Sequence, residues 1–157
     1  MSTGQISQTE STSLENTLSL AAEIGSKLRG GEVVELVSDL GGGKTTFVKG
    51  LAKGIGSQDL VRSPSFTLSN QYIGKQLILH HFDFYRLDEP GIIRDELVEV
   101  LNDQLAVITV EWANIVEDVL PEDRLTIRFE PTSENKRRLT FEYPDSLKYL
   151  INADYNN

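Results

Sequence analysis

Hydrophobic positions along the chain follow a helical period in some segments and a strand period in others. Leucine and alanine side chains recur at helical spacing from Leu14 to Leu28, and Gly30-Gly31 ends this predicted helix. Thr12 fits the first position of a capping box at the start of the helix. Two more helices are predicted, one from Thr45 to about Ala52 and one over residues 90–101.

Strand-like runs rich in β-branched and aromatic residues lie between and after these helices: Val33–Val37, Phe66–Tyr72, Gln76–Phe82, Leu105–Val110, Leu125–Phe129 and Leu139–Tyr143. The run Leu105–Val110 is almost continuously apolar, which is typical of a parallel strand buried on both faces. The last two runs alternate with period two and are joined by polar residues, which predicts a C-terminal antiparallel β-hairpin. The pattern therefore predicts an α/β fold with a mostly parallel sheet flanked by helices.

The N-terminal segment differs from the rest of the chain. Residues Met1–Ser13 are almost entirely polar, so we expect residues 1–13 to form a flexible tail. Residues 14–157 are then expected to form a single domain, since domains most often contain about 100–150 residues.

Composition and charge narrow the function classes. The chain has no cysteine, which excludes disulfides, thiolate metal sites and a cysteine nucleophile. Its formal net charge of −9 makes it a poor candidate for binding RNA or DNA directly, because such binding depends on a basic surface. The sequence shows neither a basic targeting segment nor an apolar run long enough to span a membrane, so a cytoplasmic location is expected.

The strongest chemical signal is Gly43-Lys44-Thr45, which follows a predicted strand and precedes a predicted helix. In a phosphate loop, glycine N–H groups and the helix start surround the phosphates, the lysine reaches them, and the hydroxyl residue completes magnesium coordination. Ser38 stands where the consensus has its first glycine. The alternative, a glycine-rich turn that binds nothing, is less favoured, so we predict a nucleotide site in a P-loop NTPase-like fold.

Two carboxylates follow predicted strands and are candidates for magnesium or water binding beside the loop. Asp83 follows one strand and Glu111 follows another, and α/β sheets present their ligand groups at the carboxyl ends of strands. The alternative for each is a solvated carboxylate with no chemical role.

Other polar and aromatic residues have weaker signals. His80 and His81 point to opposite faces of a strand, so structural roles are preferred over a shared metal, and only His81 lies on the face of Asp83. Trp112 is expected either in the core or packed over the nucleotide. Arg137 and Arg138 are expected either in a solvated turn or near the nucleotide.

With these residues assembled, the chain resembles the TsaE (YjeE) family of tRNA threonylcarbamoyladenosine biosynthesis ATPases over roughly residues 14–141. The resemblance is carried by an ordered set of motifs: a leading helix with Thr17, D-L-G-x-G-K-T-T at Asp39–Thr46, S-P-[ST]-F at Ser63–Phe66, H-F-D-x-Y-R-L at His81–Leu87 and E-W at Glu111–Trp112.

This resemblance implies a P-loop ATPase that is weak alone and works with the proteins TsaD and TsaB in threonylcarbamoylation of adenosine 37 of tRNA. The resemblance also implies that ATP hydrolysis resets that complex between turnovers, while the partners hold the RNA. The implied ligands are ATP or ADP and Mg²⁺.

The resemblance also implies residue roles. The nucleotide would be bound by Gly41, Gly42, Gly43, Lys44, Thr45, Thr46 and Trp112. Thr45 and Glu111 would hold the metal, and Lys44, Asp83 and Glu111 would be catalytic. Ser63–Phe66 would act as a switch-like loop that senses the γ-phosphate.

The chain departs from the family pattern at Ser38 and at Ser65, and residues 95–99 lack the glycine that the family usually carries there. Two other functions stay open from the sequence. One is a small-molecule kinase, and the other is a nucleotide-gated binding module that hydrolyses little ATP.

Overall fold

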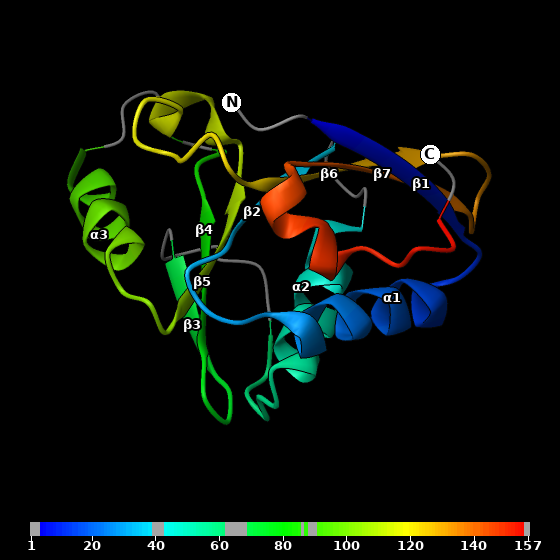
Figure 1. The fold of residues 1–157 in the computed structure, drawn as a ribbon, viewed down its shortest axis with the longest axis horizontal. Coiled ribbons are helices and arrows are strands. Elements are labelled where there is room, and N and C mark those ends of the chain that lie inside the picture. The colour runs from blue at the N-terminus through cyan, green and yellow to red at the C-terminus, as the bar shows by residue number, and fades with distance from the viewer. Residues whose placement is uncertain (1–3, 39–42, 62–68, 86, 88–90, 156–157) are drawn as a thin grey trace.

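A computed structural model describes residues 4–38, 43–61, 69–85, 87 and 91–155 (Figure 1). The strands are β1 (Gln5–Ser11), β2 (Val33–Val37), β3 (Ser69–Ile73), β4 (Ile78–Asp83), β5 (Ala106–Glu111), β6 (Leu125–Pro131) and β7 (Arg137–Tyr143). The α-helices are α1 (Leu14–Lys27), α2 (Lys44–Gly54) and α3 (Gly91–Leu101), and the short 3-10 helices are η1 (Ala113–Val116) and η2 (Asp145–Leu150).

The strands form one seven-stranded sheet in the order β1-β7-β6-β2-β5-β4-β3. The four central strands β6, β2, β5 and β4 are parallel to their neighbours within that group, which agrees with the predicted parallel strands, but the antiparallel pairs on both sides make the sheet as a whole mixed. The flanking strands add antiparallel pairs, with β3 against β4 at one edge and β7 and β1 at the other. The predicted C-terminal hairpin is confirmed as β6 and β7.

Each face of the sheet has its own apolar core. On one face, α1 and α2 pack over the sheet around Phe47, Leu51 and Leu79. On the other face, α3 and η1 cover a smaller cluster around Phe82, Leu97 and Val110 (Figure 1). Consecutive β5 residues belong to different clusters, and this explains why that strand is apolar at nearly every position.

Helices α1 and α2 approach each other closely because glycines lie at their contact. A Cβ atom added at Gly50 would lie 2.4 Å from the Cβ of Ala21, and one added at Gly54 would lie 2.4 Å from the carbonyl oxygen of Ala22. This contact fixes the direction of α2, whose first residue is Lys44.

The predicted helices and most predicted strands are confirmed, with shifts at their ends. The first helix is capped by Ser13, whose side chain accepts a hydrogen bond from the Asn16 N–H, and not by Thr12 as the capping-box pattern suggested. Asp83 is the last residue of β4, and Glu111 is the last residue of β5. The described part of the predicted strand Phe66–Tyr72 is β3, which begins at Ser69.

The prediction of a flexible tail over residues 1–13 is wrong for its described part, because Gln5–Ser11 pair with all seven residues of β7. Ser7, Thr9 and Ser11 place hydroxyl side chains on one face of β1, and those of Ser7 and Ser11 are buried. The Ser7 hydroxyl is hydrogen bonded to the Tyr143 hydroxyl at 2.7 Å, and this contact compensates its burial. A strand with a hydroxyl-bearing inner face gives no hydrophobic signal, which is why composition alone suggested a tail.

Among the residues that the structure describes, no helix is both long and apolar enough to cross a membrane.

Deletion of residues 1–11 is expected to lower the melting temperature by more than about 5 °C, because it exposes the β7 edge and removes the buried hydroxyl contacts of β1. Thermal denaturation followed by circular dichroism measures this change. The control is Ile6→Ala, which removes an exposed side chain and leaves the strand in place. An unchanged melting temperature after the deletion would mean that β1 does not stabilise the fold.

Candidate functional site

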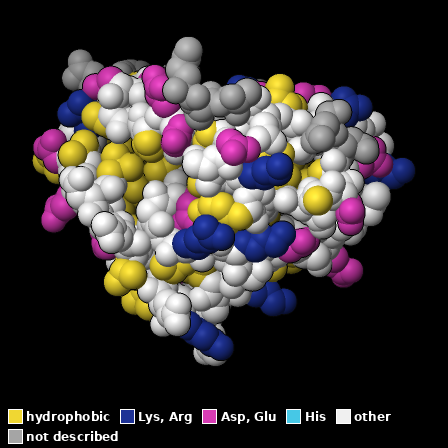
Figure 2. Space-filling model, viewed as in Figure 1, with side chains coloured by type: hydrophobic (Ala, Val, Ile, Leu, Met, Phe, Trp, Pro, Cys, Tyr) yellow, Lys and Arg dark blue, Asp and Glu magenta, His cyan; other side chains and the backbone are white. Residues whose placement is uncertain are grey.

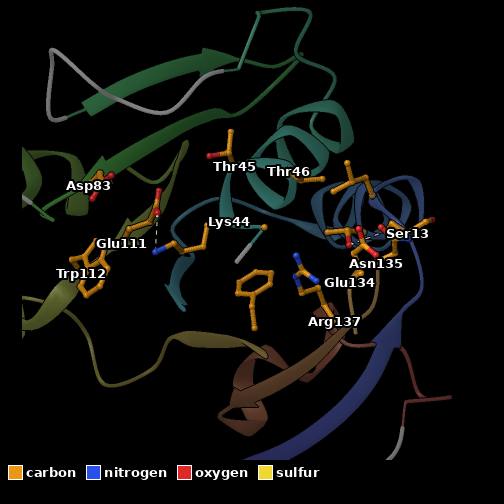
Figure 3. Close-up of a pocket in the computed structure, with 14 residues that line it drawn as sticks. Ser13, Lys44, Thr45, Thr46, Asp83, Glu111, Trp112, Glu134, Asn135 and Arg137 are labelled. Carbon is orange, nitrogen blue, oxygen red and sulfur yellow. Dashed lines mark hydrogen bonds and ion pairs between the residues drawn. The ribbon is translucent and has the colours of Figure 1, made fainter. Parts of the chain in front are cut away.

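The parallel strands direct their carboxyl ends to one edge of the sheet, and a pocket of about 500 Å³ lies there (Figure 3). Its lining comes from the start of α1, the start of α2, the ends of β4 and β5, and the β6–β7 hairpin. The lining residues are Ser13, Leu14, Thr17, Gly43, Lys44, Thr45, Thr46, Asp83, Glu111, Trp112, Phe129, Glu134, Asn135 and Arg137. The pocket therefore brings together the predicted loop, both predicted carboxylates and Trp112.

The start of α2 is open toward this pocket. Gly43 occupies the N-cap position with φ of 100°, a left-handed conformation that glycine adopts without strain. A Cβ at Gly43 would meet nothing within 4 Å, and no side chain caps the helix among the described residues. The first turn of α2, residues 43–46, lines the pocket, and a helix N-terminus is suited to bind an anion through its N–H groups and its positive dipole end.

Lys44 is buried, and its ammonium group lies among acceptors. The Nζ atom donates to the carbonyl oxygen of Ser38 at 3.2 Å and lies 3.4 Å from Oε1 of Glu111. It also lies 4.8 Å from the centre of the Trp112 ring, within the range of a cation–π interaction. The lysine is thus held by the protein's own carboxylate and aromatic ring.

Glu111 is 4% exposed and is contacted from two sides. Its Oε1 faces Lys44, and its Oε2 is hydrogen bonded to Nε2 of His81, a residue of β4 whose side chain is fully buried. Burial by itself would raise the pKa of Glu111, but the contacts with His81 and Lys44 outweigh burial and lower the pKa. The side chain is therefore a carboxylate at neutral pH.

Asp83 lies opposite Glu111 in the β4–β5 register. Its Oδ1 accepts a hydrogen bond from the Tyr85 N–H at 3.0 Å. Partial burial raises the pKa of Asp83, and the nearby Glu111 adds to this rise. The two carboxylates thus differ in their environment, since Glu111 has cationic or donor partners and Asp83 is held by a backbone N–H.

Trp112 follows Glu111 in a left-handed conformation with φ of 57°, the only positive φ among the non-glycine residues described. Its ring packs 4.9 Å from the ring of Tyr85 and lines the pocket. Of the two sequence-based alternatives for Trp112, the structure supports a position at the site.

The wall opposite α2 contains residues that sequence reasoning did not assign to the site: Ser13, Leu14, Phe129, Glu134 and Asn135. Thr17 and Arg137, both left open by the sequence, also line the pocket. Strand β1 helps to build this wall, because the Ser11 hydroxyl contacts the Thr17 hydroxyl at 2.6 Å and Ser11 pairs with Arg137 in the sheet register. No local sequence signal marks this wall, since it forms only when the two ends of the chain meet.

Arg138 and His80 do not line the pocket. Arg138 is exposed and lies 3.6 Å from Glu130. His80 projects from the opposite face of β4 to His81. Gly41, Gly42 and the segment Ser63–Phe66 were predicted to bind or sense the nucleotide, and they lie outside the described residues.

The described residues contain no group of three or more histidine, aspartate or glutamate side chains that could hold a metal ion by themselves. Magnesium at phosphate sites is usually held by one or two protein groups together with phosphate oxygens and water. Thr45 and Glu111, which line the same pocket, fit such a partial set of ligands.

Gly43→Ala is expected to lower the free energy of unfolding by about 1–2 kcal/mol, because alanine is strained at a φ of 100° even where space is available. Urea denaturation measures the loss. Gly4→Ala is the control, since a Cβ there also meets nothing within 4 Å and its φ is not in the left-handed region. Equal stability of the two variants would contradict the left-handed N-cap.

The chain is similar to known proteins in both sequence and fold. Residues 11–139 match the family model described as threonylcarbamoyl adenosine biosynthesis protein TsaE. The chain is 36% identical over 127 residues to the tRNA threonylcarbamoyladenosine biosynthesis protein TsaE of Bacillus subtilis, covering 81% of this chain and 79% of that protein. It is 37% identical to the TsaE protein of Treponema pallidum over 130 residues, covering 83% of this chain and 96% of that protein.

A crystal structure of Bacillus subtilis YdiB superposes with a TM-score of 0.77 at 32% sequence identity, covering 96% of this chain and 94% of that one. This superposition confirms the predicted P-loop NTPase-like α/β fold. On the family model, the curated relatives and this structure, the chain belongs to the TsaE family of tRNA threonylcarbamoyladenosine biosynthesis proteins.

Proposed function

We propose that this protein binds ATP with Mg²⁺ in the pocket at the carboxyl edge of its sheet and hydrolyses the γ-phosphate. The observation that carries the proposal is the convergence, in one pocket of about 500 Å³, of a helix start that no described side chain caps, a buried lysine and two carboxylates. Family membership supplies the process that this activity would serve.

The residues at the α2 start fit a chain of phosphates. The open N–H groups beyond Gly43 would bind the phosphate oxygens, and Lys44 would exchange its contact with Glu111 for the β- and γ-phosphates. Lys44 would keep an anionic neighbour throughout, because a phosphate would take the place of the Glu111 carboxylate.

The acidic residues fit a partial magnesium site. Thr45 and Glu111 would hold the ion, and Asp83 would orient water beside it. Magnesium, when bound, neutralises charge on the phosphates. The backbone N–H of Tyr85 already fixes the Asp83 carboxylate before any ligand arrives.

The far wall fits the sugar and base of a nucleotide. Phe129 offers an apolar surface, and Thr17, Asn135 and Arg137 offer hydrogen-bonding groups along the same pocket. Trp112 lies at the opposite end beside Lys44, so its ring would flank the phosphates and help to exclude water.

The activity would serve threonylcarbamoylation of adenosine 37 of tRNA, together with the TsaD and TsaB proteins, in the cytoplasm. A chain with a net charge of −9 is poorly suited to bind RNA, because RNA binding depends on a basic surface. The partners would therefore hold the tRNA, and this subunit would hydrolyse ATP. Turnover by the isolated chain is expected to be slow, because partners commonly complete the active sites of P-loop enzymes.

Lys44→Ala is expected to weaken ATP binding about 10- to 100-fold, because charged hydrogen bonds of this kind contribute about 1.5–3 kcal/mol. Isothermal titration calorimetry with a non-hydrolysable ATP analogue and Mg²⁺ measures the affinity. Lys49→Ala is the matched control, since Lys49 is an exposed lysine of the same helix. Equal affinities for the two variants would contradict the proposal that Lys44 belongs to a phosphate-binding loop.

Glu111→Gln is expected to lower ATP hydrolysis about 100-fold or more while changing nucleotide affinity much less, since it removes the carboxylate charge and keeps the side-chain volume. Phosphate release is measured with the chain alone and with TsaB and TsaD added, and the partners are expected to raise the wild-type rate. An unchanged rate of hydrolysis in Glu111→Gln would mean that Asp83, and not Glu111, is the carboxylate needed for hydrolysis. Phosphorylation of an added small hydroxyl compound would favour a kinase instead, and ATP binding without hydrolysis, even with the partners present, would favour a nucleotide-gated module.

A further inference from the structure

His81 is a buried histidine of the site whose role is not assigned by the proposed nucleotide contacts. We propose that His81 is a positioning residue that holds the Glu111 carboxylate in the orientation needed for magnesium. This inference rests on the proposed ATPase function and adds a residue to it.

The contact between the two side chains is fixed by the sheet. His81 and Glu111 lie on neighbouring parallel strands, β4 and β5, and both side chains face α2. The imidazole is fully buried, and its Nε2 is hydrogen bonded to Oε2 of Glu111. A ring enclosed on all sides cannot follow the carboxylate if it moves, so the ring holds the carboxylate in one place.

In the hydrogen bond between the two side chains, His81 is the donor and Glu111 is the acceptor. Among the described residues, Nδ1 of His81 is buried and has no hydrogen-bond partner. A carboxylate can only accept, so Nε2 must carry a proton. A second proton on Nδ1 would be a buried donor for which the described residues offer no acceptor.

The two partners of Glu111 differ in how easily they can leave. Lys44 lies at the start of a helix on a long side chain, and in the proposed function it moves to the phosphates. This movement frees Oε1 of Glu111 toward the pocket. His81 remains on Oε2, so the carboxylate keeps its orientation when one of its oxygens becomes available for the metal.

His80 provides a matched comparison within the same strand. It is also a buried histidine, but its side chain lies on the opposite face of β4, away from Glu111. Substitution of His80 shows how the removal of a buried imidazole affects the protein. Substitution of His81 has this effect and also removes the hydrogen bond to Glu111.

The first experiment titrates Mg²⁺ at a fixed concentration of a fluorescent, non-hydrolysable ATP analogue. His81→Leu is expected to raise the half-saturating Mg²⁺ concentration about 10- to 100-fold, the usual effect of losing a group that orients a metal ligand, and to leave binding of Mg²⁺-free nucleotide unchanged. His81→Gln should recover most of the loss, because its amide can donate near the position of Nε2. His80→Leu and His80→Gln should match the wild type.

The second experiment determines, in the nucleotide-free protein, which ring nitrogen of His81 carries the proton. The chain has two histidines, so long-range proton–nitrogen correlation spectra of the wild type and of His80→Gln identify the His81 ring. The proton is expected on Nε2. This measurement needs no substitution at His81 and tests whether Nε2 can donate to Glu111 even if His81→Leu fails to fold.

The proposal is overturned if the neutral His81 ring carries its proton on Nδ1, or if folded His81→Leu needs no more Mg²⁺ than His80→Leu. A wild-type protein that binds no nucleotide with Mg²⁺ would instead refute the proposed function. The spectra would then still report separately which nitrogen of His81 carries the proton.

Discussion

The Glu111 carboxylate is a negative charge inside the protein, and the arrangement of the site depends on how that charge is compensated. A buried carboxylate without partners is strongly unfavourable. Here Lys44 from α2 and His81 from β4 meet it from two sides, and each partner comes from a different element. The position of α2 over the sheet and the β4–β5 register must therefore both be correct before the charge is stable.

Lys44 joins this charge compensation to the start of α2. The helix start carries open N–H groups and a buried lysine, both of which attract anions. Glu111 and the Trp112 ring contact that lysine inside the pocket. A phosphate would therefore replace an existing partner, and little would have to be reorganised when it binds.

The outer wall of the pocket depends on contacts between distant parts of the chain. Strand β1 pairs with β7, and the Ser11–Thr17 contact joins this edge of the sheet to the start of α1. The polar N-terminal segment thus supports a wall of the site. Its buried hydroxyl groups bond to other side chains, so it contributes through hydrogen bonds in a place where hydrophobic patterning shows nothing.

The sequence by itself determined the α/β class, the loop at Gly43–Thr45 and the two strand-end carboxylates, because periodicity and motif spacing are local properties of the chain. Only the tertiary structure decided the β1 pairing, the contribution of Arg137 but not Arg138 to the pocket, and the partnership of His81 with Glu111. Each of these depends on which strands become neighbours, and strand order follows from packing of the whole chain, not from any one segment.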